Sequence, residues 1–420
     1  MSDASTTEPA GDVEPPRTEP ARTPLVRVLD QIRRTAGLPL ELGETLPPAA
    51  YSSPELYDLE VERIFRREWL CVARADQIPR PGDYLALDVL TEPIVITRDE
   101  DGALHALSRV CRHRFMDVLP PGHAPRQGNL SRLTCPYHTW TYRLDGRFAG
   151  QLTGAPLMHK VDFDRANCRL PLVRLAVWNG FVLINLDADA SPPRLDGPAG
   201  ELAAYGLDDW VTAEPLTWTD VAANWKVAAE NGAESYHHLG THAATLQPLL
   251  PGQATQITEC GENWFSMRNP LHPDAALNSG FPPVPGLSPE QRSGLLITGV
   301  FPTFVLTVMP DHAAWFRWLP TGPATHETQI AILTPGTTRD RPDYQEVIST
   351  YRAFYHQVQT EDLLAIHGVQ RGLASTTSHP GRLSHLERPI WQFQRYLAKA
   401  LTDRRNDQTP PAGDSAGKSP

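Results

Sequence analysis

The chain has no long apolar run, no excess of basic residues and few cysteines, and each of these shortages excludes a class of protein. No stretch of the 420 residues approaches the roughly 18 consecutive apolar residues that a membrane helix needs. The opening MSDASTTEPAGDVEPP is acidic and polar, whereas a secretory signal is basic and then apolar. We therefore expect a cytoplasmic protein that contacts no membrane.

The shortage of basic residues bears on possible partners. The chain has 38 Lys and Arg against 49 Asp and Glu, which gives a formal net charge of −11. Nucleic-acid binding needs clustered Lys and Arg to neutralise phosphates. We expect no nucleic-acid partner, and we attribute the acidic excess mainly to solubility.

The five cysteines are too few and too scattered for a disulfide framework. In a reducing compartment, an odd and sparse set favours ligation of a metal or a cluster over disulfide bonds. The cysteines are Cys71, Cys111, Cys135, Cys168 and Cys260.

The length allows two ordinary domains, and the composition changes along the chain in a way that separates them. The ends are polar or rich in Pro and cannot offset their ordering entropy by burial. The predicted parts are a disordered tail (1–23), N-terminal helices packing on the second domain (24–68), a small antiparallel β domain (69–187), a linker (188–205), an α+β domain (206–402) and a second disordered tail (403–420).

Local patterns indicate the class of each domain. Short β-rich runs such as 93–97 and 180–186, broken by Gly, Pro and Asp pairs, predict an antiparallel sheet in the first domain. Strand candidates followed by late helices predict an α+β second domain. The strand candidates are 294–300, 303–309, 313–319 and 327–333, and the helix candidates are 225–239, 343–373 and 386–401.

The first domain contains two Cys/His pairs, Cys111-Arg-His113 and Cys135-Pro-Tyr-His138. Two Cys and two His can hold tetrahedral zinc, or a [2Fe–2S] cluster in which His replaces Cys on one iron. The C-x-H spacing is unusual for zinc, so the cluster is favoured. Imidazole ligands raise the reduction potential of such a cluster, which suits an electron relay.

The segment Asn224–His242 contains a second group of candidate ligands, Glu234, His237 and His242. A helix would place Glu234 and His237 on one face, and Gly240 would break that helix and turn His242 back. A non-haem iron site that activates oxygen needs two His and one carboxylate, so a further ligand must come from elsewhere in the chain. The neighbouring His238 would face another direction and is not expected to bind metal.

The motif Cys-Arg-His-Arg with Cys-Pro-Tyr-His-x-Trp-Thr-Tyr, together with the Asn224–His242 segment, resembles the large (alpha) subunit of Rieske non-haem iron ring-hydroxylating oxygenases. The resemblance implies an N-terminal small antiparallel-β Rieske domain and a C-terminal helix-grip-like α+β catalytic domain. It assigns Cys111 and Cys135 to one cluster iron, and His113 and His138 to the other.

Two residues near the cluster depart from the family pattern. Phe115 and Thr139 stand where the family usually has Gly. Neither is a ligand, but both would alter the packing around the cluster and could shift its potential.

The resemblance also assigns the second site. It implies a mononuclear iron held by His237, His242 and Asp362, because the family's carboxylate precedes a Gln-x-Gly on a late helix and this chain has Gln370-Arg-Gly372. The adjacent Glu361 is the alternative carboxylate ligand. Glu234 is implied to bridge an iron His and a Rieske His of the neighbouring subunit, which predicts a homotrimer. The same catalytic motif includes Asn231 and Tyr236.

The implied function is that of a terminal oxygenase, which uses O2 to hydroxylate or oxidatively demethylate a small organic substrate. Glu234, where most dioxygenases have Asp, favours a monooxygenase over the alternative, a cis-dihydroxylating aromatic dioxygenase. Two alternatives of another class are a zinc-stabilised binding protein and a plain Rieske electron carrier. No dinucleotide or flavin fingerprint is present, so NAD(P)H would act only through a separate reductase, with or without a ferredoxin.

The sequence leaves the substrate open, and also the presence of a beta subunit. An aromatic cavity would suit a benzene ring and a methylated ammonium group equally well. The aromatic residues predicted to line it are Trp264, Phe265, Phe301, Phe304, Trp315 and Phe316.

Overall fold

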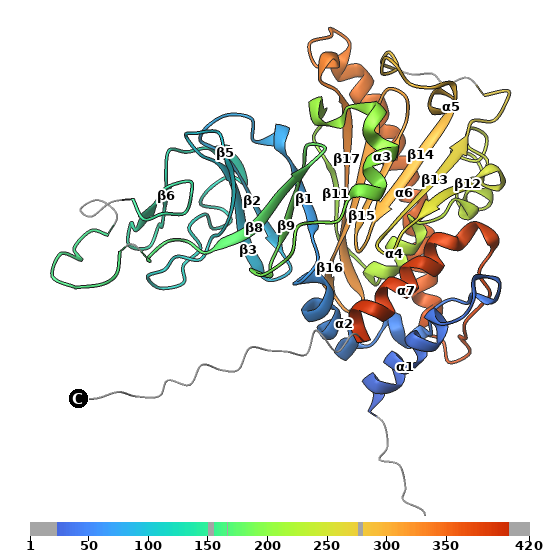
Figure 1. Ribbon diagram of the computed structural model, residues 1–420, viewed down its shortest axis with the longest axis horizontal. Coiled ribbons are helices and arrows are strands. Elements are labelled where there is room, and N and C mark those ends of the chain that lie inside the picture. Colours follow the sequence, from blue (N-terminus) through green and yellow to red (C-terminus); the bar gives the residue numbers. More distant parts are fainter. Residues whose placement is uncertain (1–22, 150–154, 166, 276–279, 403–420) are drawn as a thin grey trace, which may run out of the picture.

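The computed structural model describes residues 23–149, 155–165, 167–275 and 280–402, which form two antiparallel sheets with helices around the second (Figure 1). This arrangement confirms the predicted α+β class. The tails predicted at 1–23 and 403–420 lie, apart from Thr23, outside the described residues. None of the described helices is both long and apolar enough to cross a membrane.

Two helices precede the first sheet, α1 (Pro24–Ala36) and α2 (Pro54–Glu60). Each begins with a Pro that follows a capping hydroxyl. Thr23 accepts a hydrogen bond from the backbone N–H of Val26, and Ser53 accepts one from that of Leu56. Pro fits the first turn because its missing N–H would have no helical partner there. Shorter turns follow these helices at η1 (Leu40–Leu42), η2 (Pro48–Tyr51) and the π-helical η3 (Val61–Phe65).

The first sheet has seven strands in the order β1-β9-β8-β4-β3-β2-β5, and every neighbouring pair is antiparallel. A separate hairpin, β6 (Leu133–Thr134) and β7 (Thr141–Tyr142), contains the second Cys/His pair in its turn. The seven strands are β1 (Leu70–Arg74), β2 (Asp83–Val89), β3 (Glu92–Arg98), β4 (Leu104–Ser108), β5 (Gln127–Asn129), β8 (Leu172–Trp178) and β9 (Phe181–Asn185).

The segment predicted as a linker, 188–205, is partly helical. It contains α3 (Asp196–Leu202), followed by a short turn, η5 (Ala203–Tyr205). Leu195, Leu202 and Tyr205 are buried in a core cluster with residues of both sheets. Its Ala, Pro and Gly content conceals these three anchoring side chains from the sequence pattern, and its role as a linker stays a prediction.

The second sheet has eight strands. Seven follow the order β10-β17-β16-β15-β14-β13-β12, and β11 also pairs with β17. The four strands predicted between residues 294 and 333 are confirmed as β14 to β17. The eight strands are β10 (Trp210–Thr212), β11 (Leu216–Val221), β12 (Gln256–Cys260), β13 (Trp264–Pro270), β14 (Gly294–Val300), β15 (Phe304–Val308), β16 (Ala313–Gly322) and β17 (Thr325–Pro335).

The two predicted late helices are confirmed as α6 (Tyr344–Leu373) and α7 (Arg388–Thr402). Tyr351 and Tyr355 of α6 pack with Ile330 and Ile332 on one face of the second sheet. The opposite face packs against β9 and α3 through a separate core cluster. The second sheet therefore lies between α6 and the first sheet, with α6 along one side (Figure 1). The remaining helices and turns are α4 (Trp225–Asn231), α5 (Pro289–Arg292), η4 (Ala75–Gln77), η6 (Leu207–Asp209), η7 (Tyr236–Leu239), η8 (Gly252–Ala254), η9 (Gly336–Thr338) and η10 (His385–Glu387).

Candidate functional site

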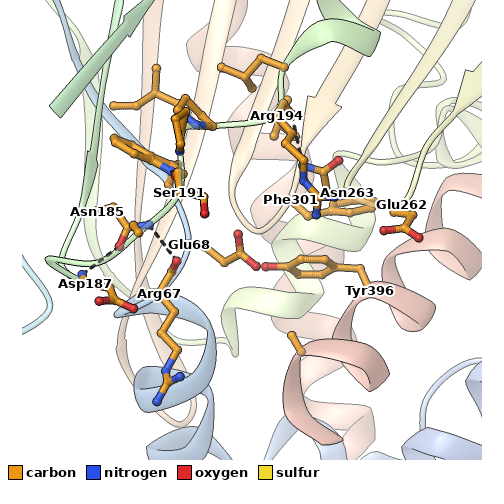
Figure 2. Close-up of a pocket in the computed structure, with 18 of the residues that line it drawn as sticks. Arg67, Glu68, Asn185, Asp187, Ser191, Arg194, Glu262, Asn263, Phe301 and Tyr396 are labelled. Carbon is orange, nitrogen blue, oxygen red and sulfur yellow. Dashed lines mark hydrogen bonds between the residues drawn. The ribbon is translucent and has the colours of Figure 1, made fainter. Parts of the chain in front are cut away.

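A polar cavity of about 480 Å³ lies between the two sheets, near the start of β1 and the end of α7 (Figure 2). Charged residues of both signs line it, among them Arg67, Glu68 and Glu262, and burial raises the pKa of Glu68. No His or Cys is among the described residues that line this cavity. It therefore lacks the side chains expected of an iron site.

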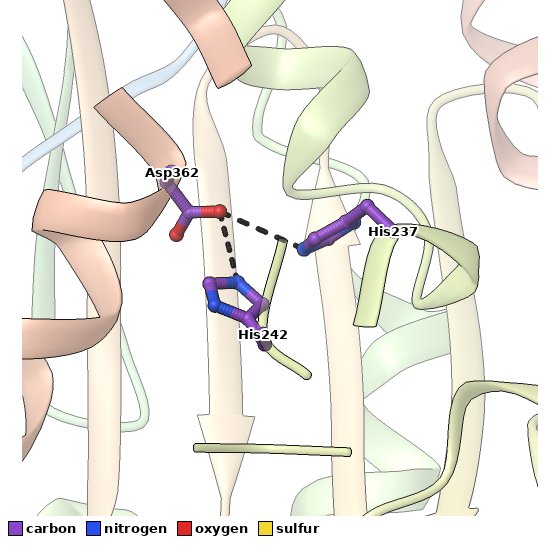
Figure 3. Close-up of side chains that lie close together, drawn as sticks. All are labelled: His237, His242 and Asp362. Atoms are coloured by element: carbon purple, nitrogen blue, oxygen red, sulfur yellow. Dashed lines mark hydrogen bonds and ion pairs between the residues drawn. The ribbon is translucent and has the colours of Figure 1, made fainter. Parts of the chain in front are cut away.

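A second cavity, on the α6 side of the second sheet, contains the three predicted iron ligands (Figure 3). One oxygen of Asp362, Oδ1, lies 3.0 Å from Nε2 of His242 and 3.6 Å from Nε2 of His237. One ligand atom from each residue lies within 4.8 Å of the others, as a single ion would require. Two imidazoles and a carboxylate are the donor set of non-haem Fe(II) sites. The structure thus brings the three residues together, and their role as ligands stays a prediction.

The backbone reaches this site by a path that differs from the predicted helix over 225–239. Helix α4 begins at an Asn224 cap and ends at Asn231, and residues 236–239 form the separate turn η7. Gly232 lies directly against Trp318. A Cβ added at this position would lie 2.4 Å from the indole ring. The break therefore comes at Gly232, eight residues before the predicted break at Gly240.

Each candidate histidine has a carboxylate on its outer nitrogen. Oε1 of Glu234 lies 2.5 Å from Nδ1 of His237, and Oε2 of Glu361 lies 2.7 Å from Nδ1 of His242. These contacts leave both Nε2 atoms facing Asp362, an arrangement typical of metal-binding imidazoles. Glu361 therefore lies behind a histidine, while Asp362 faces the centre.

The carboxylates also make the centre favourable for positive charge. Burial alone would lower the pKa of His242, but hydrogen bonds and charge from Asp362 and Glu361 raise it above its usual range. A cation that replaces the proton at Nε2 would receive the same stabilisation.

Three other residues of the predicted motif lie in different surroundings. Asn231 lines the cavity. Tyr236 is 47% exposed and is not among the described residues that line it. His238 is buried, with Nδ1 2.9 Å from the carbonyl oxygen of Leu250, and burial lowers its pKa to about 4. His238 nevertheless also lines the cavity, next to His237, and its exclusion from the iron ligands stays a prediction.

The cavity itself has a volume of about 330 Å³. Of the six aromatic residues predicted to line it, Phe316 alone is among the described residues that do so. Side chains alternate along a strand, so Phe316 and Trp318 of β16 face the cavity while Trp315 packs on the opposite side. Helix α6 supplies further aromatic rings from one face, at Tyr351, Phe354 and Tyr355. No Lys or Arg is among the described lining residues.

The four predicted cluster residues converge at the tip of the first domain. Cys111 and Cys135 are each 1% exposed, and the rings of His113 and His138 have centroids 4.6 Å apart. Nδ1 of His113 is buried and has no hydrogen-bond partner among the described residues. Burial raises the pKa of the Cys135 thiol, so ionisation needs a positive partner such as iron. Two thiols, two imidazoles and an orphaned ring nitrogen fit a cluster with mixed ligands.

Phe115 and Thr139, the two departures near the cluster, share an uncommon backbone conformation. Their φ angles are 59° and 58°, in the left-handed region. The N–H of Phe115 donates to the carbonyl oxygen of Cys111, and that of Thr139 donates to that of Cys135. Each residue thus closes a tight turn four positions after a cluster cysteine. Gly adopts this conformation without strain, which explains the family preference.

The sequence analysis missed a buried polar network and a neighbouring amide. Nδ1 of His312 lies 2.8 Å from Asp311, and its Nε2 lies 3.1 Å from the hydroxyl of Tyr355. Gln359 lies one helical turn after Tyr355, in the same cavity wall. The Asp-His pair between two predicted strands was a signal for the network, but nothing in the sequence distinguishes Gln359 from the other glutamines of the chain.

Two family models match the chain, one in each half. The model of the Rieske [2Fe-2S] domain matches residues 68–170, and that of the ring hydroxylating alpha subunit (catalytic domain) matches residues 204–403. The first match contains the four cluster residues. The second contains His237, His242 and Asp362.

Proteins similar over most of the chain are oxygenase subunits. The glycine betaine monooxygenase oxygenase subunit of Chromohalobacter salexigens is 28% identical, over 91% of this chain and 90% of that protein. The carnitine monooxygenase oxygenase subunit of Acinetobacter baumannii is 28% identical, over 80% of this chain and 86% of that protein. A crystal structure of a quaternary ammonium Rieske monooxygenase bound to an inhibitor matches with a TM-score of 0.74 and 26% identity, covering 88% of this chain and 98% of that one.

Proposed function

Because the chain belongs to the large (alpha) subunits of Rieske non-haem iron ring-hydroxylating oxygenases, we propose that it oxidises a methylated quaternary ammonium compound as a monooxygenase. As a member of this family it is a terminal oxygenase that contains a [2Fe–2S] cluster and a mononuclear iron and uses O2. Its electrons come from a separate reductase, and such oxygenases often form oligomers. A plain electron carrier or a zinc-stabilised binding protein would not match the model of the catalytic domain.

The cofactor chemistry divides between the two halves of the chain. When bound, the cluster passes single electrons and the iron activates O2. Cys111, His113, Cys135 and His138 hold the cluster in this proposal. His237, His242 and Asp362 hold the iron, while Glu234 and Glu361 fix the orientation of the two imidazoles through their Nδ1 atoms.

Glu234 also connects the two centres in the proposed assembly. Oε1 contacts the ring of His237, Oε2 accepts from the backbone N–H of the same residue, and the side chain is 9% exposed at the cavity wall. In a homotrimer, a cluster histidine of the neighbouring subunit would take the other side of this carboxylate. That contact would bring the cluster of one subunit close to the iron of the next.

The cavity on the α6 side of the second sheet, which contains His237, His242 and Asp362, is called the α6 cavity here, and its charge supports a cationic substrate. Glu234 and Asp362 contribute carboxylates, Phe316, Trp318 and Tyr355 contribute rings, and the described lining residues include no Lys or Arg. Aromatic faces attract quaternary ammonium groups through cation–π interactions, and no cationic side chain among the described lining residues opposes that attraction. The printed names of the relatives point to the same class of compound.

An oxygen-uptake screen with a surrogate reductase tests this proposal. We expect uptake coupled to product for trimethylammonium compounds, with formaldehyde or an aldehyde released after hydroxylation next to nitrogen. Arenes of similar volume serve as the comparison. Coupled formation of cis-diols from arenes, with no oxidation of any ammonium compound, would establish the dioxygenase alternative instead.

A further inference from the structure

Among the described residues that line the α6 cavity, Gln359 has a buried side-chain nitrogen without a hydrogen-bond partner. We infer that the side-chain amide of Gln359 donates a hydrogen bond to a neutral oxygen atom of the substrate, a hydroxyl, ether or carbonyl oxygen. We also infer that the cavity binds a substrate with a free carboxylate less well, because no Lys or Arg among the described lining residues can pair with it. Gln359 is thus a specificity-determining residue, and this inference rests on the proposed function for the nature of the cationic group.

The first support is the state of the amide. Gln359 is 2% exposed, and its Nε2 is buried without a hydrogen-bond partner among the described residues. The residue lines the cavity and precedes Asp362 by three positions on α6, about 4.5 Å along the helix axis. Buried donors are nearly always partnered in folded proteins, so a lone donor beside a reaction site indicates a ligand that completes it.

The second support is the contrast with neighbouring polar groups. The hydroxyl of Tyr355, one turn earlier on α6, already lies 3.1 Å from Nε2 of His312. The other nitrogen of His312 lies 2.8 Å from Asp311. These groups satisfy one another, and His312 and Tyr355 belong to the cavity lining. Gln359 lies between Tyr355 and Asp362 on α6, and its amide nitrogen has no such partner among the described residues.

The third support is the charge that surrounds this position. A divalent iron would have its two positive charges offset by the carboxylates of Asp362 and Glu234. The imidazole of His312 is paired with Asp311, and no Lys or Arg is among the described lining residues. A substrate carboxylate would therefore be buried without a counter-ion, which is strongly unfavourable. A neutral oxygen needs only the single donor that Gln359 provides.

The test uses three probes that share a trimethylammonium group. Choline has a hydroxyl, ethyltrimethylammonium lacks any oxygen, and glycine betaine has a carboxylate. Titration calorimetry with the iron-loaded protein gives a dissociation constant for each. We expect choline to bind about 3- to 10-fold more tightly than ethyltrimethylammonium, as one neutral hydrogen bond provides, and glycine betaine to bind most weakly.

Variants then assign the difference to Gln359. In Gln359→Leu, and in Gln359→Met, which keeps the length of the side chain, choline should lose its advantage over ethyltrimethylammonium. The matched control is Gln394→Leu in α7, because Gln394 is 0% exposed and both of its amide atoms lack partners among the described residues. Gln394 lies outside the cavity lining, so this variant should keep the wild-type ratio. An advantage that survives in both Gln359 variants, or glycine betaine binding as tightly as choline, overturns the inference.

A second set of probes separates this inference from the proposed function. Benzyl alcohol has a hydroxyl, toluene has no oxygen and benzoate has a carboxylate, as in the first set. All three have a phenyl group in place of the trimethylammonium group. An oxygen advantage seen only in this set, and lost in the Gln359 variants, contradicts the quaternary ammonium proposal and supports the role of Gln359. The absence of an oxygen advantage in both sets contradicts the role of Gln359.

Discussion

Glu234 contacts His237 twice, through both of its carboxylate oxygens. Oε1 lies 2.5 Å from the ring Nδ1, and Oε2 accepts a hydrogen bond of 2.9 Å from the backbone N–H of the same residue. The two contacts close a turn of four residues, so the imidazole and the carboxylate are held as one unit. A test of the electron-transfer role must therefore preserve this turn.

The substitution Glu234→Gln meets that requirement, because an amide oxygen can still accept the backbone hydrogen bond. We expect the cluster to remain loaded and iron content to fall no further than in the matched control below, while turnover per bound iron falls by about 100-fold, at the upper end of what loss of a carboxylate behind a metal-bound His causes. The measurement is the rate at which the pre-reduced cluster is reoxidised in a single turnover, with iron content as a check.

Glu361→Gln is the matched control for that experiment, because Glu361 holds His242 as Glu234 holds His237. It should change iron content about as much as Glu234→Gln does, without slowing electron transfer in molecules that retain iron. Normal reoxidation of the cluster in Glu234→Gln would exclude the bridging role.

The choice of carboxylate ligand can be tested in adjacent residues. Asp362→Ala should lose the mononuclear iron and keep the cluster, because Asp362 faces Nε2 of both His237 and His242. Glu361→Ala should keep most of its iron. Iron content, together with the EPR signal of the reduced cluster, measures both outcomes. The opposite pattern, with iron lost only from Glu361→Ala, would reverse the assignment.

The parts of this site that the sequence predicted are those in which chemistry depends on short spacing. Two residues separate Cys135 from His138 and one separates Cys111 from His113, so the pairs are visible without a fold. Strands β14 to β17 could also be predicted from the sequence, because their β-branched and aromatic residues favour a strand whatever distant residues they contact.

Other parts depend on contacts between distant residues. The break after α4 follows from Gly232 meeting Trp318, which is 86 positions away, and no local rule contains that contact. Trp315 was mispredicted as a lining residue because β16 is apolar on both faces, so the pattern does not say which face meets the cavity. The lone amide of Gln359 becomes visible only once its neighbours are placed.

Tyr142 should set the potential of the cluster. Its hydroxyl lies 3.3 Å from the Sγ of Cys111 and accepts a hydrogen bond from the backbone N–H of Arg112. Hydrogen bonds to cluster sulfurs stabilise the reduced state, so Tyr142→Phe should lower the reduction potential. Tyr84→Phe, in the same core but bonded to the carbonyl oxygen of Pro125, should leave it unchanged. A redox titration followed by circular dichroism decides, and equal potentials in the two variants would contradict this role.

Glu230 should make stability depend on pH. Burial raises its pKa from 4.5 to about 7, beside the hydroxyl of Tyr51 at 2.7 Å. A raised pKa in the folded state gives stability that is complete below pH 4.5 and is lost as pH rises towards 7, by about 1.4 kcal/mol per pH unit. The melting temperature of Glu230→Gln should therefore rise relative to wild type between pH 5 and 7. A difference between the two proteins that stays constant over this pH range would contradict the raised pKa.

Backbone strain in the turns at Phe115 and Thr139 can be tested by comparing the stability of a Gly variant with that of an Ala variant at each position. At an ordinary position Ala is more stable than Gly, by about 0.5 to 1 kcal/mol in a helix or strand, because Gly loses more backbone entropy on folding. At φ angles of 59° and 58° the order should reverse, since any Cβ is strained there and Gly has none. Thr139→Gly should thus melt at a higher temperature than Thr139→Ala, and Phe115→Gly at a higher temperature than Phe115→Ala.

Thr134 supplies the comparison position, because it is exposed, lies in the same hairpin and has no positive φ. There the Ala variant should be the more stable of the two. Thermal melting followed by the visible absorbance of the cluster measures all six variants on the domain that contains the substitutions. If Ala is also the more stable residue at 115 and 139, these turns are not strained, and the glycines of the family need another explanation.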